Sequence, residues 1–203
     1  MKILISLFTG YLFGCISPAA ILSRRKHVNL KREGTKNLGA TNTALVLGCR
    51  AGVIVLLVDI MKSILSAKLV KIIFPETLYI GMVASIGCIL GHCYPVFMDF
   101  HGGKGLAAFA GMVLEYRLWF AFPIVIPGLV LIVILNTGVA APMWGCILFP
   151  ILVAFSQGST KEICLAFFSS CIIVWTHRDN LRRAFARKEN ITVRDYLDKV
   201  ITK

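Results

Sequence analysis

Residues 118–135 read LWFAFPIVIPGLVLIVIL and contain no charged side chain. A helix needs about 20 predominantly apolar residues to cross the hydrocarbon core of a bilayer, and this stretch is close to that length. It therefore predicts a membrane-spanning helix. Further apolar runs occur elsewhere in the chain, and they cover residues 3–21, 51–66 (interrupted by Asp59 and Lys62), 78–98, 105–114, 139–155 and 163–176.

The composition of the whole chain points the same way. Hydrophobic residues make up 57% of the 203 residues, charged residues make up 16%, and the mean hydropathy is +0.79. A soluble domain carries about 25% charged residues. Disorder, collagen and coiled coil are therefore excluded, and a soluble enzyme is disfavoured. The seven cysteines form no CxxC pair, and we expect most to be small buried hydrophobic side chains rather than disulfides or metal ligands.

The basic residues predict the orientation of the spans. Lys and Arg number 22 against 10 Asp and Glu, a net charge of +12, which we interpret as a positive-inside signature rather than a nucleic-acid site. Residues 24–50 carry seven Lys and Arg, and the tail after Thr176 carries eight. Seven spans with the N-terminus outside place both segments in the cytoplasm. Because runs 105–114 and 163–176 are short, five spans are the alternative.

These features predict an all-α polytopic membrane protein with a single domain over residues 1–203. Residues 177–203 form its cytoplasmic basic tail. The first apolar run has no clear cleavage site after it, so we expect it to be a helix of the mature protein rather than a signal peptide.

The first candidate site is the segment GTKNLGATNT at residues 34–43. Its two glycines allow backbone N–H groups to approach an anion, and Lys36 adds a positive charge. The segment predicts a phosphate cradle, and the alternative is an ordinary polar loop that caps the next helix.

The second candidate site begins with GHCYPVF at residues 91–97 and ends with HGGKG at residues 101–105. The Gly-Gly-Lys-Gly element opens an apolar run, where helix N-terminal N–H groups and a lysine attract a phosphate. The P-loop spacing is absent, since Leu106 follows Gly105. A tight turn is the alternative for this element, and a satisfied structural histidine is the alternative for His92.

Two further groups of residues are candidates. His177 and Asn180 lie just past the last apolar run, where a histidine can act as a base, and the alternative is a basic anchor of Arg178, Arg182 and Arg183 on anionic lipid. Asp59 and Lys62 are three residues apart within one apolar run. They form either a functional or a structural ion pair.

Together these motifs resemble the bacterial acyl-phosphate:glycerol-3-phosphate acyltransferases. Residues 34–42 resemble that family's G-S-x-N-x-G-A-T-N motif, and residues 91–105 are similar to its second motif. The H-R-D-N at residues 177–180 and the downstream Glu189 resemble its C-terminal motif. Asp59 and Lys62 also occupy family positions. The order and spacing agree from Gly10 to about Asn190.

The resemblance implies a seven-helix enzyme of the cell inner membrane with its site at the cytoplasmic face. Such an enzyme moves a fatty acyl group from acyl phosphate to the 1-hydroxyl of glycerol 3-phosphate, giving lysophosphatidic acid and phosphate in phospholipid biosynthesis. Its partners are these substrates and membrane lipids, without nucleic acid, metal or cofactor. The implied catalytic residues are His177 and Asn180. The implied substrate- and phosphate-binding residues are Thr35, Lys36, Asn37, Gly39, Asn42, His92, Gly102, Gly103, Lys104, Gly105 and Glu189.

Three positions depart from the family pattern. Thr35 replaces a serine, Leu45 replaces an arginine, and residues 137–142 contain no serine. We therefore expect acyl-phosphate binding to be kept and affinity for glycerol 3-phosphate to be low. The alternative function is a diverged paralogue that binds acyl phosphate or lipid without turnover. A small transporter would show inverted repeats, and the sequence has none.

Overall fold

The structure is a computed structural model that describes residues 1–186 and is helical without strands over that range. Two short 3₁₀ turns, η1 (Val96–Met98) and η2 (Leu118–Phe120), accompany the α-helices. The helices are α1 (Lys2–Cys15), α2 (Pro18–Arg25), α3 (Ala40–Leu47), α4 (Cys49–Ile73), α5 (Ile80–Cys93), α6 (Leu106–Tyr116), α7 (Ala121–Leu135), α8 (Ala140–Phe155), α9 (Thr160–Thr176) and α10 (Arg178–Phe185).

Each predicted apolar run contains a helix, but the first run is broken in two. Helix α1 ends at Cys15, and α2 begins at Pro18 after the extended residue Ile16. Proline is favoured at the first position of a helix because it has no N–H to leave unpaired. The Ser17 hydroxyl caps α2 by accepting a hydrogen bond from the Ala20 N–H at 3.3 Å. The single helix predicted over residues 3–21 is therefore two helices joined at a bend.

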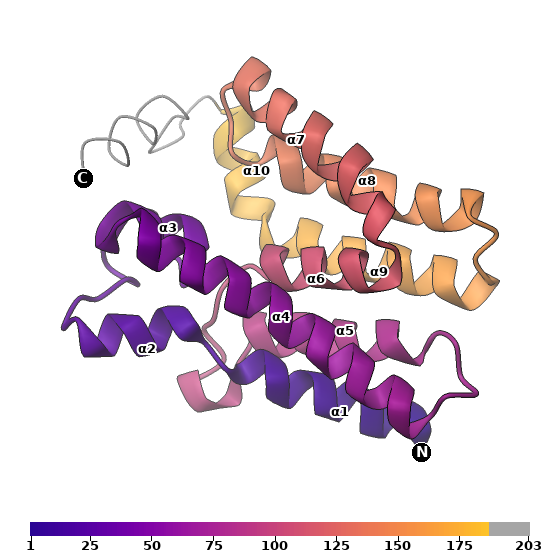
Figure 1. Cartoon of the computed structure of the whole chain (residues 1–203). Helices are drawn as coiled ribbons and strands as arrows, with labels where there is room; N and C mark the ends of the chain where they lie inside the picture. The colour runs from indigo at the N-terminus through magenta and orange to yellow at the C-terminus, as the bar shows by residue number, and fades with distance from the viewer. Residues whose placement is uncertain (187–203) are drawn as a thin grey trace.

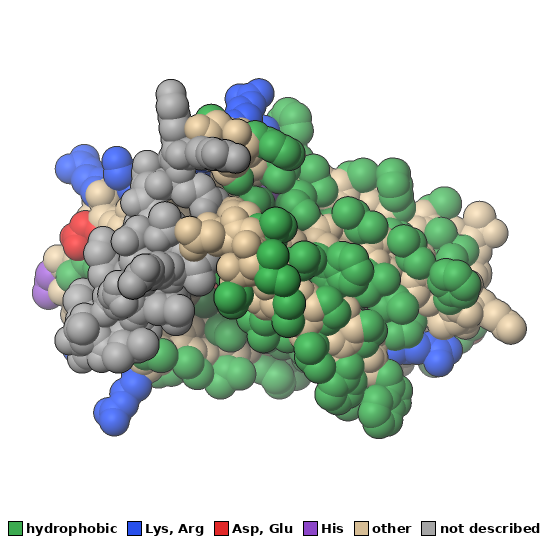
Figure 2. Space-filling model, turned by 90° about the horizontal axis from the view of Figure 1, so that it is seen from above, with side chains coloured by type: hydrophobic (Ala, Val, Ile, Leu, Met, Phe, Trp, Pro, Cys, Tyr) green, Lys and Arg blue, Asp and Glu red, His purple; other side chains and the backbone are tan. Residues whose placement is uncertain are grey.

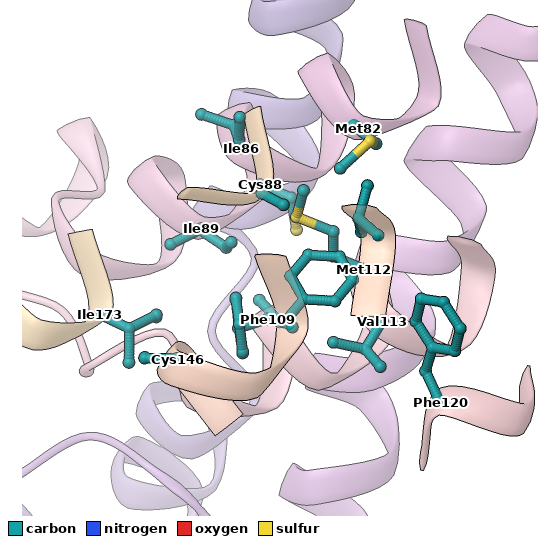
Figure 3. Close-up of a cluster of buried hydrophobic side chains, with 14 of the residues drawn as sticks. Met82, Ile86, Cys88, Ile89, Phe109, Met112, Val113, Phe120, Cys146 and Ile173 are labelled. Atoms are coloured by element: carbon teal, nitrogen blue, oxygen red, sulfur yellow. The ribbon is translucent and has the colours of Figure 1, made fainter. Parts of the chain in front are cut away.

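Two sets of contacts hold the helices together. Between α1 and α5 the backbones approach so closely that a Cβ at Gly10 would lie 1.8 Å from the Ala84 carbonyl oxygen. The main hydrophobic core joins α5, α6, α8 and α9, as Figure 3 shows for part of it. In that core the rings of Phe109 and Phe149 meet edge to face with centroids 5.5 Å apart.

Four of the seven cysteines (Cys15, Cys88, Cys93 and Cys146) are buried, whereas Cys49, Cys164 and Cys171 are exposed.

The connecting segments gather at two opposite ends of the helix bundle (Figure 1). One end holds the N-terminus and the α4–α5 and α8–α9 turns, and there Lys71 Nζ pairs with Glu115 Oε1 at 2.7 Å. Lys2 also pairs with Glu76 at this end. The other end holds the α2–α3 and α5–α6 loops together with α10. The two loop motifs and His177 with Asn180 lie on the segments of this second end, whereas Asp59 and Lys62 lie within α4.

Apolar side chains cover much of the outer surface. Figure 2 shows one face that is mostly hydrophobic, with charged side chains mainly toward the end that carries α10. Three segments of the described chain are long and apolar enough to cross a membrane, and α6 and α8 are shorter apolar helices. The three segments are Lys2–Arg25, Ile80–Met98 and Leu118–Leu135.

Candidate active site

The Gly-Gly-Lys-Gly loop is held tightly against the end of α5. The Gly102 N–H donates to the Cys93 carbonyl and the Gly103 N–H donates to the His92 carbonyl, each at 3.0 Å. These two N–H groups are therefore occupied by the loop's own fold. The free donors at this place belong to the first turn of α6, which follows Gly105, because the first N–H groups of a helix have no partner within it. Gly105 itself has φ of +82°, in the left-handed region that favours glycine.

Lys104 joins this loop to the junction between α9 and α10. Its Nζ donates to Asn180 Oδ1 at 2.6 Å, and its carbonyl oxygen lies 2.8 Å from the Thr176 hydroxyl. The pKa of the Lys104 ammonium is lowered to about 8, mainly by burial and less by the Arg183 charge, and Asp179 opposes both. The ammonium remains the major form at neutral pH.

His177 is buried at the same junction, where α9 ends and α10 begins. Its Nδ1–H donates to the Ile173 carbonyl at 2.9 Å, which leaves Nε2 as the atom with a free lone pair. The pKa of His177 is lowered to about 4, mainly by burial; the Ile173 hydrogen bond opposes this shift, and the Lys104 charge adds to it. The imidazole is therefore neutral at neutral pH and can accept a hydrogen bond.

The loop of the first motif is shaped by Asn42. This side chain is fully buried; its Oδ1 accepts from the Thr35 N–H at 2.6 Å, and its Nδ2 donates to the Leu30 carbonyl at 2.8 Å. Gly34 has φ of +58°, and a Cβ there would meet Asn42 Oδ1 at 2.2 Å. Asn42 thus orders the loop from its buried side, while Thr35 and Lys36 are exposed on the loop surface.

The first and second loops touch at Gly103. A Cβ on Gly103 would lie 2.5 Å from the Leu38 carbonyl oxygen, so the two backbones are packed together. The Leu38 side chain is buried in a small core with Ala19, Leu30 and Val55. Asn37 and Gly39, on either side of Leu38, are partly exposed beside the second loop.

A buried ionic cluster lies behind the second loop. Lys62 Nζ lies 2.7 Å from Asp59 Oδ1 and donates to the carbonyls of Gly14 and Ile16 at 3.0 and 2.9 Å, beside the bend between α1 and α2. Its remaining partner is His92 Nδ1, at 2.9 Å. If this nitrogen accepts the Lys62 hydrogen, the His92 proton lies on Nε2, the atom that a Cβ on Gly103 would meet at 2.2 Å.

The structure thus brings Lys104, His177 and Asn180 together, with Gly102, Gly103 and Gly105 forming the loop between them. His92 lies behind that loop, and the first loop lies beside it. Glu189 is outside the described residues. Leu45 is buried in α3, and residues 137–142 form the end of the α7–α8 turn and the first residues of α8.

Comparison with known sequences decides the family. The sequence profile of the glycerol-3-phosphate acyltransferases matches residues 4–187. The chain belongs to the glycerol-3-phosphate acyltransferase family. A glycerol-3-phosphate acyltransferase of Thermoanaerobacter pseudethanolicus is 29% identical to it over 191 residues, which cover 94% of this chain and 96% of the relative.

Solved structures of an acyltransferase agree with the fold. PlsY, an integral membrane glycerol 3-phosphate acyltransferase, superposes in its glycerol 3-phosphate form with a TM-score of 0.85 and 26% identity, over 94% of this chain and 95% of that one. Its lysophosphatidic acid form gives a TM-score of 0.85 and 25% identity over 97% and 99%. The predicted all-α membrane fold is confirmed at this level, and this family member is a membrane protein.

The sequence did not predict two residues of this acyltransferase site. Thr176 was not considered, although its hydroxyl contacts the Lys104 backbone. Arg183 was grouped with Arg178 and Arg182 as a lipid anchor, but the three differ in their contacts. Arg178 stacks on the Trp175 ring at 4.5 Å, Arg182 pairs with Asp179 at 3.8 Å, and Arg183 donates to Asn180. A helical spacing of three residues from Asn180 was the available signal for Arg183.

Proposed function

We propose that this protein transfers a fatty acyl group from acyl phosphate to the 1-hydroxyl of glycerol 3-phosphate, giving lysophosphatidic acid and phosphate for phospholipid synthesis. One observation carries the proposal. A cation, Lys104, and a neutral histidine, His177, lie close together at the first turn of α6. The relatives' names and the two ligand forms of PlsY support the acceptor and the product. The acyl-phosphate donor rests on the motifs.

Both substrates carry a phosphate, so the site needs anion-binding groups in more than one place. The unpaired N–H groups of α6 and the Lys104 ammonium provide one place. The exposed part of the first loop, with Thr35, Lys36 and Asn37, provides a second place beside it. In this scheme Gly39 and Asn42 shape the first loop. His92 and the glycines of the second loop set the position of Lys104. Glu189 stays a predicted member of the site.

The chemistry follows from the protonation of His177. The acceptor hydroxyl oxygen forms a bond to the acyl carbon, and the bond from that carbon to the phosphate oxygen breaks. His177 Nε2 accepts the hydroxyl proton and passes it to the released phosphate. A histidine with a pKa of about 4 is a weak base, but a bound phosphate dianion raises that pKa because it stabilises the imidazolium. Substrate binding thus makes the histidine a better base. In this scheme Asn180 holds the Lys104 ammonium in place.

The proposal includes the placement of the protein in the cell. The chain is one domain of seven spans in the inner membrane, with the N-terminus outside and the second end of the bundle, which carries the site, in the cytoplasm. The basic segments 24–50 and 177–203 support this orientation. Both proposed loops and α10 are at that end (Figure 1).

The testing experiment uses purified protein in detergent with acyl phosphate and glycerol 3-phosphate. We expect release of phosphate that requires both substrates. We expect no product when acyl-coenzyme A or the acylated form of acyl carrier protein replaces acyl phosphate. His177→Ala should lose most of the turnover while binding is retained. Binding of acyl phosphate without turnover by the wild-type protein would instead support the non-catalytic paralogue.

A further inference from the structure

Two cations converge on one oxygen atom at the junction of α9 and α10. Asn180 Oδ1 accepts a hydrogen bond from Lys104 Nζ at 2.6 Å and another from Arg183 Nη2 at 2.7 Å. Lys104 comes from the α5–α6 loop and Arg183 from the last half of α10. The Asn180 side chain therefore holds two positive charges side by side.

This arrangement places a net positive charge without a matching carboxylate among the described residues. Asp179, the acidic residue on α10, pairs with Arg182 at 3.8 Å. The Arg183 charge contributes to the lowered pKa of Lys104, after burial, which is the sign of repulsion between them. Two cations held this close are electrostatically unfavourable until a multivalent anion lies between them. Such an anion can reach the place, because Arg183 is exposed while Lys104 and Asn180 are only partly buried.

We propose that Arg183 and Lys104 together bind the phosphate group of a substrate, with Asn180 as the group that fixes their spacing. A guanidinium can donate two parallel hydrogen bonds to phosphate oxygens, and an ammonium adds a compact charge. The inference deepens the proposed function and rests on it. It also changes one expectation from the sequence. Leu45 supplies no charge to the first motif, but Arg183 supplies a cation from another helix, so the low affinity for glycerol 3-phosphate no longer follows if glycerol 3-phosphate is the ligand of this pair.

The phosphate monoester that fits this pair has three sources: glycerol 3-phosphate, acyl phosphate and a lipid headgroup. Kinetics in lipid-free detergent separates them, because only the substrate that uses the pair changes its KM. An effect that requires vesicles of anionic phospholipid would identify the headgroup and overturn the assignment to a substrate.

Arg183→Gln is the test variant, because glutamine keeps a donor for Asn180 Oδ1 and removes the charge. Arg182→Gln is the matched control, since it makes the same change one residue away on a side chain that pairs with Asp179 instead. Loss of a charge-assisted contact lowers affinity by roughly 10- to 100-fold. We therefore expect Arg183→Gln to raise the KM for one substrate by at least about ten-fold, with a smaller change in kcat. Arg183→Lys should recover part of the loss, and the control should keep wild-type values.

A second measurement tests whether the Arg183 charge acts on Lys104 in the enzyme. Removing the Arg183 charge should raise the Lys104 pKa, so the alkaline limb of kcat/KM should move to higher pH in Arg183→Gln and stay in place in Arg182→Gln. Unchanged KM values and an unchanged limb in an active Arg183→Gln enzyme would overturn the inference.

Calorimetric titration with glycerol 3-phosphate and with inorganic phosphate keeps the test independent of turnover. Weaker binding by Arg183→Gln would support the cation pair even if the wild-type protein transferred no acyl group. Equal binding of both ligands by a folded variant and the wild-type protein would contradict it.

Discussion

Replacing Gly103 by alanine tests whether the two loops form one rigid site. The added Cβ would lie 2.2 Å from His92 Nε2 and 2.5 Å from the Leu38 carbonyl oxygen, whereas ordinary contact begins at 3.4 Å. The neighbours must therefore retreat by roughly 1 Å. Neither can do so easily, since Lys62 holds the His92 ring and the buried Leu38 side chain holds the first loop.

A displacement of about 1 Å in a reactive geometry costs on the order of 100-fold in rate. We expect Gly103→Ala to lower kcat/KM for acyl transfer by about that factor. Overpacking also costs about 1–3 kcal/mol of stability, so a thermal unfolding curve must show that the variant is still folded at the assay temperature.

The control is Gly138→Ala in the α7–α8 turn, where a Cβ would meet no atom within 4 Å. This variant should keep its activity and its unfolding temperature. Activity within about three-fold of wild type for a folded Gly103→Ala protein would refute the argument, because the contacts with His92 and Leu38 would then not constrain the site.

Three further predictions follow from the charges. Because the Lys104 pKa is about 8, kcat/KM should fall as the pH rises through 8. Lys104→Arg should shift that fall to higher pH, and an unshifted fall would exclude Lys104 as the group that titrates. His177 has a pKa of about 4 in the folded protein and about 6.5 in the unfolded chain, so the unfolded chain binds more protons between these two pH values. The free energy of unfolding should therefore drop by about 1.6 kcal/mol from pH 6.5 to 5, and less in His177→Asn, as measured by chemical denaturation. In a cysteine-free background, a cysteine at Ser159 should react with an impermeant reagent added to intact cells and one at Asn37 should not, whereas cytoplasmic labelling at Ser159 would favour five spans.

The motifs were predictable from the sequence because they consist of unusual polar residues in an apolar chain. Asp59 and Lys62 were expected to pair from their spacing of three residues, and they do so at 2.7 Å. The bend after α1 was not predicted, although Ser17 and Pro18 are a typical helix start. The carbonyls that the bend exposes explain why a buried lysine is tolerated, because two of them accept its hydrogen bonds.

The roles of individual polar residues were harder to predict. Asn42 stays a predicted member of the binding set, and the structure adds that its Oδ1 and its Nδ2 each make a hydrogen bond that orders the loop. Lys104 and Asn180 are separated by 76 positions in the chain, and the packing of α5 and α6 against α9 brings their side chains to 2.6 Å. Local periodicity contains no information about such a contact, so the pairing of Lys104 with Arg183 became visible only in three dimensions.

The most direct test of acyl transfer is the stoichiometry of the two products. Purified protein receives acyl phosphate and radiolabelled glycerol 3-phosphate, and lysophosphatidic acid and free phosphate are quantified together over time. The account predicts one lysophosphatidic acid for each phosphate released, with both products lost when either substrate is omitted. Phosphate release accompanied by free fatty acid, without lysophosphatidic acid, would contradict it.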